Sequence, residues 1–148
     1  MRKRSSSPLP AVMSARGDLE NIRRTEASHI MSSSDAEMDE FELHVARKRE
    51  HLNDRLAAYE KLLADEEDRR RLRKAQADVA AYLALWNKLQ EVSRQTATDP
   101  TAFEQARVIF MTDGLKAFDA ALLSLNELWS YNETLGKTKM EEAGAAST

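Results

Sequence analysis

The stretch DEEDRRRLRKAQADVAAYLALWNKLQEVSR, residues 65–94, has the clearest periodicity in the chain. Within it, apolar and small residues recur at alternating steps of three and four, the spacing of one face of a helix packed in a bundle. Acidic residues lead and basic residues follow, an order that suits the dipole at a helix amino terminus. We therefore predict a helix from residue 65, buried along one face. The face consists of Leu72, Ala75, Val79, Tyr82, Trp86, Leu89 and Ser93.

Three further segments show apolar residues at helical spacing. Between the first two, serines break the pattern. Ser34 and Glu37 have the spacing of a capping box, in which the two side chains satisfy backbone donors at a helix start. Before the last segment, Asp99 and Pro100 are residue types that cap and open a helix. The predicted helices cover residues 9–31, 35–63 and 100–143.

These segments predict an all-α fold. The second and third are similar in length and almost directly joined, so they must be antiparallel neighbours. We predict an antiparallel up-down-up-down four-helix bundle with long first and fourth helices, the fourth extending past its partners. The bundle is expected over residues 9–143, with a flexible N-terminal flank at residues 1–8 and a flexible C-terminal tail at residues 144–148.

Composition excludes several classes of function. The 148 residues suffice for one domain with a core, and the net charge of −3 gives no argument for nucleic-acid binding. The chain has no cysteine, so disulfides, zinc–thiolate sites and cysteine nucleophiles are excluded. No apolar run reaches the roughly 18 to 20 residues of a membrane span. No nucleophile-elbow motif is present, and we expect a soluble chain that is not an enzyme and holds no cofactor.

A metal site inside the bundle has only partial support. Di-iron bundles use two Glu-x-x-His pairs and two further glutamates. This chain has one such pair, Glu26 and His29, whereas His44 and His51 lack a glutamate at the matching position. We therefore expect no metal, and histidines that are solvated or at the edge of the core.

Arginines near the end of the first helix form a candidate anion site. In an up-down-up-down bundle this region and the start of the fourth helix lie at the same pole, where their side chains can surround one cleft. Guanidinium groups bind carboxylates through charge-assisted, often bidentate hydrogen bonds. The simpler interpretation is ordinary surface charge, in which Arg23 pairs with Glu26 and Arg107 pairs with Glu104. The candidates for the cleft are Arg23, Arg24, His29, Arg107 and Thr112.

Three stretches together resemble the four-helix-bundle sensor domain of bacterial methyl-accepting chemotaxis receptors. The resemblance rests on their joint order and spacing over nearly the whole chain: an arginine-bearing first helix, Tyr59 near the end of the second, an aromatic third, and Asn132 late in the fourth. They are LPAVMSARGDLENIRRTEASHIMSSSDAEMDEFE (residues 9–42), YEKLLADEEDRRRLRKAQADVAAYLALWNKLQEVSRQ (residues 59–95) and EQARVIFMTDGLKAFDAALLSLNELWSYNETLGKTKMEEAG (residues 104–144).

The resemblance implies the periplasmic portion of an inner-membrane receptor, excised here from between two membrane spans. It implies a homodimer packed through the first helix, whose formation depends on ligand in some members of the family. It also implies a fourth helix that leads to the second span. Ligand binding shifts that helix slightly toward the cytoplasm, where a kinase and adaptor proteins are the partners of the full-length receptor.

The resemblance also implies a small organic acid as ligand, either a di- or tricarboxylate or an aromatic acid. The full arginine set of the aspartate-type receptors is not present at its spacing, which argues against an amino acid. Tyr82 and Trp86 are candidates for stacking on an aromatic acid, with core packing as the other interpretation. The alternative function is a cytosolic helical-bundle scaffold or adaptor without a small-molecule ligand. The positions that match the family's carboxylate-binding stretches are Arg23, Arg24, Arg107 and Thr112.

Overall fold

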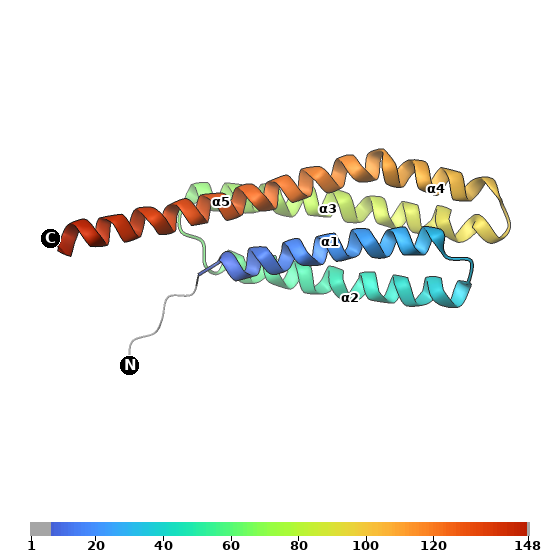
Figure 1. The fold of residues 1–148 in the computed structure, drawn as a ribbon, viewed down its shortest axis with the longest axis horizontal. Coiled ribbons are helices and arrows are strands. Elements are labelled where there is room, and N and C mark those ends of the chain that lie inside the picture. Colours follow the sequence, from blue (N-terminus) through green and yellow to red (C-terminus); the bar gives the residue numbers. More distant parts are fainter. Residues whose placement is uncertain (1–6, 148) are drawn as a thin grey trace.

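The computed structural model describes residues 7–147, which form a helical bundle without strands. The predicted all-α four-helix bundle is confirmed, with α4 and α5 together in the place of the fourth helix (Figure 1). The connections α1–α2 and α3–α4 lie at one end, the distal pole; α1 begins and α5 projects at the other, the proximal pole. The helices are α1 (Leu9–Met31), α2 (Asp35–Glu60), α3 (Glu66–Arg94), α4 (Thr101–Met111) and α5 (Asp113–Ser147), with a short 3-10 helix at Gln95–Ala97.

The core is formed by the inward faces of α1, α2, α3 and the α4–α5 segment. α1 lies beside α2, and α3 lies beside α4 and α5, so that two antiparallel pairs face each other (Figure 1). The periodic face predicted for α3 is buried along its whole length, from Leu72 to Ser93. Burying a leucine-sized side chain contributes about 1.5–3 kcal/mol, so this face is a main source of the bundle's stability.

The helix boundaries follow local capping chemistry. The Ser34 hydroxyl accepts a hydrogen bond from the Glu37 N–H at 3.3 Å, as predicted. The other half of the capping box is absent, because the Glu37 carboxylate accepts instead from the Ser32 hydroxyl at 3.0 Å. α2 ends at Glu60, before the predicted end at residue 63, and the Asp65 side chain caps α3.

The predicted continuous fourth helix is wrong. It is interrupted at Thr112, whose backbone angles of φ −110° and ψ −90° are not helical. The Thr112 N–H still bonds the Val108 carbonyl and the Lys116 N–H bonds the Thr112 carbonyl, at 2.9 and 3.0 Å. The regular α-helical course of the chain is therefore interrupted at this residue.

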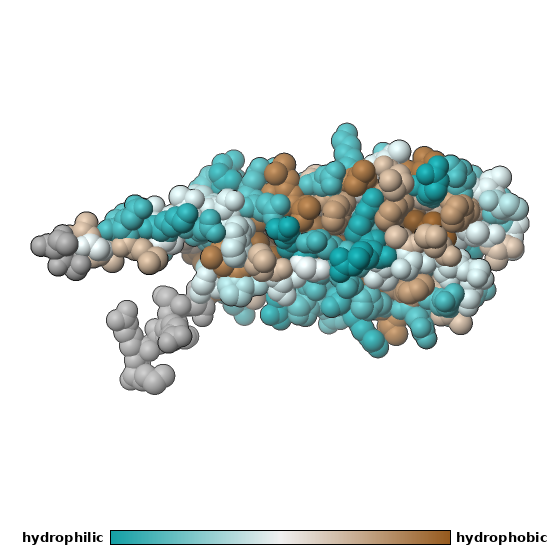
Figure 2. Space-filling view, viewed as in Figure 1, coloured by the Kyte–Doolittle hydropathy of each residue, from teal (hydrophilic) through white to brown (hydrophobic). Residues whose placement is uncertain are grey.

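The chain ends differ from the predicted flanks in one respect. α5 continues to Ser147, past the boundary predicted at Ala143. Of the predicted N-terminal flank, residues 1–6 lie outside the described part of the chain, and Ser7 and Pro8 precede α1 directly. The projecting end of α5 is largely hydrophilic on the face seen in Figure 2. Within residues 7–147, no helix combines the length and hydropathy needed to cross a membrane.

A buried polar network joins the elements near the proximal pole. The Asp68 carboxylate accepts hydrogen bonds from the Tyr59 hydroxyl, from the Ala64 N–H at 3.0 Å and from the Asn132 amide at 3.1 Å. Burial, together with the hydrogen bond to Asp68, raises the pKa of Tyr59, so its hydroxyl stays protonated and donates. One carboxylate thus ties α2, the α2–α3 connection and α5 to the first turn of α3.

We expect Asp68→Ala to lower the free energy of unfolding by about 3 kcal/mol, because the Tyr59 hydroxyl and the Ala64 N–H lose their acceptor and the Asn132 amide loses one of its acceptors. Chemical denaturation monitored by circular dichroism measures this. Asp54→Ala removes an exposed aspartate of α2 and is the matched control, with an expected change within about 0.5 kcal/mol. Equal stability of the two variants would contradict the assigned role of Asp68.

Candidate functional site

Arg23 of α1 lies against the break between α4 and α5. Its guanidinium carbon is 3.5 Å from the centre of the Phe110 ring and 5.6 Å from that of Phe118. Its Nη1 would be 3.2 Å from a Cβ at Gly114, and the Ile109 carbonyl oxygen would be 3.0 Å from the same atom. A side chain at residue 114 would therefore displace the guanidinium or the backbone, which explains glycine at this point of the helix.

Glu26 lies one turn beyond Arg23 and is only 1% exposed. One carboxyl oxygen accepts a hydrogen bond from the Tyr82 hydroxyl of α3. The other, Oε2, is buried without a hydrogen-bond partner, as is Nη1 of Arg23. The predicted ion pair between the two residues is absent from the described part of the chain. The Glu-x-x-His spacing makes Glu26 half of a metal motif, but its burial follows from a different signal, its position four residues after Ile22 on the buried face of α1.

The ionisation of Glu26 follows from this burial. Loss of hydration raises the pKa of Glu26 to about 8, and the Tyr82 hydrogen bond and the Arg23 charge offset only part of that effect. At neutral pH the carboxyl group is therefore mostly protonated and uncharged. Arg23 consequently has a charge that no carboxylate neutralises, and its guanidinium instead faces aromatic rings and the end of α4.

The other predicted anion-binding residues lie near this point but do not all face it. Thr112 is at the break, where its hydroxyl donates to the Val108 carbonyl at 2.6 Å. Arg107 is exposed and pairs with Glu104 at 2.7 Å, as the simpler interpretation predicted. Arg24 is exposed on the outward face of α1. The structure thus brings Arg23 and Thr112 to the break, whereas Arg107 pairs with Glu104 and Arg24 is exposed.

His29 is not part of this site and is fully buried, so the prediction of solvated or edge-of-core histidines is wrong for it. Its Nε2 is 2.7 Å from the Glu42 carboxylate and its Nδ1 is 2.8 Å from the Ser93 hydroxyl. Burial lowers the pKa of His29, and Glu42 opposes part of that effect. The group resembles a hydrolase triad in composition, but Ser93 and His29 are each 0% exposed, so a substrate has no access to them. Its effect is to join α1, α2 and α3.

Tyr82 and Trp86 are core residues. Tyr82 bonds Glu26 and meets the Phe118 ring edge-on at 5.7 Å. Trp86 meets the His29 ring at 5.2 Å in the same manner. Both are almost completely buried, so an aromatic acid would have to displace these neighbours to stack on either ring. Their geometry is that of core packing.

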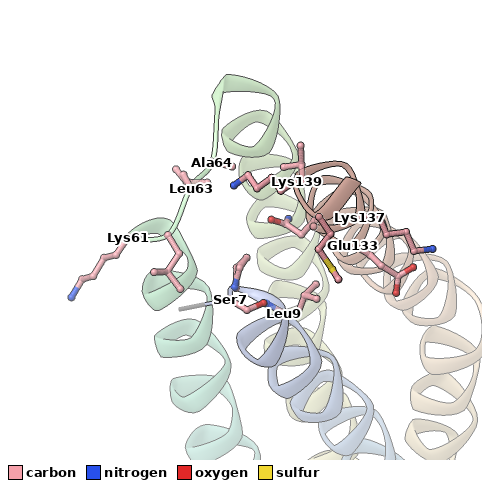
Figure 3. A pocket seen from close by; sticks show the side chains of 14 residues that line it. Ser7, Leu9, Lys61, Leu63, Ala64, Glu133, Lys137 and Lys139 are labelled. Carbon is pink, nitrogen blue, oxygen red and sulfur yellow. The ribbon is translucent and has the colours of Figure 1, made fainter. Parts of the chain in front are cut away.

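Metal ligands and cavities do not point to another centre. In residues 7–147 no group of three or more histidine or acidic side chains is arranged to hold a metal ion. A cavity of about 980 Å³ lies at the proximal pole between the start of α1, the α2–α3 connection and α5. In Figure 3 the charged ends of Lys61 and Lys137 extend away from it, so these two lysines do not point at a ligand there. We therefore place the candidate site at the α4–α5 break.

A protein-family model described as a four helix bundle sensory module for signal transduction matches residues 6–146. No curated protein and no solved structure matches the chain. The family match covers α1 to α4, the break and nearly all of α5.

We expect Glu26→Gln to stabilise the protein increasingly as the pH rises from about 5 to about 9. A carboxyl whose pKa is raised on folding contributes stability at pH values below its unfolded pKa, and that stability is lost as the pH rises toward the folded value of about 8. Glutamine has the same shape as glutamate and cannot ionise, so the melting temperature of the variant does not fall for this reason. Differential scanning fluorimetry of both proteins across pH measures the difference; a constant difference in melting temperature would rule out a raised pKa.

Proposed function

The chain belongs to the family of four-helix-bundle sensory modules for signal transduction, and we propose that it is the extracytoplasmic ligand-binding domain of a chemotaxis receptor. A sensory module is not an enzyme. The observation that carries the proposal is the unneutralised cation of Arg23 beside a break in the helix that leads out of the bundle.

We propose a small organic acid as the ligand, a di- or tricarboxylate or an aromatic acid. Arg23 offers a buried, unpartnered N–H group at Nη1, and the first turn of α5, with its backbone N–H groups, begins beside it at Gly114. A carboxylate between them would receive charge-assisted hydrogen bonds from both and the favourable end of the α5 dipole. Arg24 and Arg107 are exposed arginines available to a second carboxylate, and the Phe110 ring suits an aromatic acid.

The proposed mechanism is a shift in the position of α5. A ligand that bridges α1 and the break favours whichever arrangement of α5 gives it the better contacts, and its effect is limited by its differential affinity for the two states. α5 has 35 residues without interruption, a length of about 50 Å. A small displacement at Asp113 is therefore carried to the end of the helix. In the full-length receptor this end would lead to a membrane span and to the cytoplasmic kinase and adaptor partners.

We propose that the domain forms a homodimer through the outward face of α1. This face carries Met13 and Met31, which are 50% and 79% exposed, and Gly17 and Arg24 between them. A Cβ at Gly17 would meet nothing within 4 Å in its own chain. Glycine in a helix costs about 1 kcal/mol relative to alanine, so its presence suits close approach of a second helix. Arg24 would then face the partner subunit.

The alternative function is a cytosolic scaffold or adaptor. The family match favours a sensor because the family is described by signal transduction and sensing. The hydrophobic side chains that gather over α4 and α5 in Figure 2 suit either function. Exposed hydrophobic residues of these two helices include Phe103, Val108, Met111 and Leu115, at 37–50% exposure.

A thermal-shift screen against di- and tricarboxylates, aromatic acids and amino acids tests the ligand. Ligand at about one hundred times its dissociation constant adds about 2.7 kcal/mol, a rise in melting temperature of roughly 5–10 °C. For each compound that binds, we expect Arg23→Ala to abolish the rise and Arg47→Ala, which removes an exposed arginine of α2, to preserve it. Equal shifts in the two variants would remove Arg23 from the site, and no shift with any carboxylate would favour the scaffold.

Sedimentation equilibrium tests the dimer. We expect Gly17→Leu to weaken self-association at least tenfold, because the new side chain fills the space needed by the second helix. Gly136→Leu is the matched control, since Gly136 lies on α5 and a Cβ there also meets nothing within 4 Å. Neither change should destabilise the monomer, and a Gly17→Leu protein that associates like the control would refute this interface.

A further inference from the structure

Arg23 and Glu26 have opposite charges in their ionised forms and lie one turn apart on α1, yet they do not pair. Each has one buried polar atom without a hydrogen-bond partner, Nη1 and Oε2 respectively. The guanidinium lies on the Phe110 ring and beside Gly114, at the break. Side chains three residues apart on a helix are close enough to pair. A direct pair between the Arg23 guanidinium and the Glu26 carboxylate is therefore a second arrangement open to these residues.

Few groups act on Glu26. From α3, the Tyr82 hydroxyl donates a hydrogen bond to it. From its own helix, Arg23 acts through its charge. The Phe110 ring of α4 and the Phe118 ring of α5 face the Arg23 guanidinium, and neither ring ionises. In the described part of the chain, no charged group of α2, α4 or α5 is among the influences on Glu26. Arg23 is therefore the cation available to Glu26 when it loses its proton.

We propose that Glu26 is a proton-operated switch on Arg23, and hence on the anion site at the α4–α5 break. This regulation rests on the proposed function. With Glu26 neutral, the guanidinium remains at the break, where an anion can bind it. When Glu26 releases its proton to solvent, the buried carboxylate requires a counter-charge. Arg23 then turns toward Oε2, leaves Phe110 and Gly114, and is withdrawn from the anion.

The switch operates in a useful range of pH. Burial raises the pKa of Glu26 to about 8, so moderate alkalinity is sufficient to ionise it. An anion at the break neutralises Arg23 and so makes ionisation of Glu26 less favourable. By linkage, binding of the anion takes up a proton at Glu26 whenever that group was ionised beforehand. Affinity for a carboxylate therefore falls as the pH rises through the titration of Glu26.

A titration of the ligand-free protein by nuclear magnetic resonance tests this switch. Three signals are followed from about pH 6 to about pH 9.5: the Glu26 carboxyl carbon, the Arg23 Cδ protons, and the Gly114 α protons with the Phe110 ring. We expect all three to change with one shared midpoint near the pKa of about 8. Glu26→Gln should remove the changes at Arg23 and Gly114. Glu40→Gln, which removes an exposed glutamate of α2, should leave them intact.

Two results would overturn the proposal: a Glu26 carboxyl that has already titrated at the acidic end of the range, or a Glu26 midpoint in range without any response at Arg23 and Gly114. The titration of the wild-type protein alone would reveal either result, so the proposal remains testable if Glu26→Gln does not fold. Because no ligand is present, failure of the switch is distinct from failure of the ligand screen.

Discussion

The hydrogen bond between Tyr82 and Glu26 joins α3 to α1 in the middle of the core. Apolar side chains alone allow neighbouring helices to slide and repack, because dispersion contacts are not directional. A buried hydrogen bond is directional and is costly to leave unmade. Other buried polar contacts join the helices at further positions along the bundle. Toward the distal pole, His29 forms hydrogen bonds with Ser93 and Glu42. The hydrogen bond to Glu26 fixes the position of α1 along the bundle axis, and with it the position of Arg23 beside the break.

α1 and α2 are joined by polar contacts along much of their length. All three histidines of the chain lie between these two helices. Besides the contact of His29 with Glu42, His44 is 2.6 Å from the Asn21 side chain and His51 is 2.5 Å from the Asp18 carboxylate. The α1–α2 pair is thus joined by directional side-chain contacts, whereas Arg23 meets α4 and α5 mainly through aromatic faces.

Sequence patterns predicted the bundle because its elements are set by local signals. The face of α3 and the Ser34 cap depend only on residues a few positions apart. The break at Thr112 was not predictable in this way, since Gly114 alone is a weak signal and Arg23, which occupies the space beside it, comes from another helix. The burial of His29 and the unpaired state of Arg23 and Glu26 likewise depend on what α2, α3 and α4 bring next to them. The candidate residues were therefore found by type, and their roles only by packing.

The close approach of Arg23 to Gly114 also constrains how this sequence can diverge. A methyl group at residue 114 would lie 3.2 Å from the guanidinium and 3.0 Å from a backbone oxygen. A descendant that gains a side chain at 114 must therefore shorten or relocate the side chain at 23, or close the break. The two positions are expected to change together across related chains, although 91 residues separate them along the sequence (114 minus 23). Such paired substitution would leave a record of this contact in lineages that have lost the arginine.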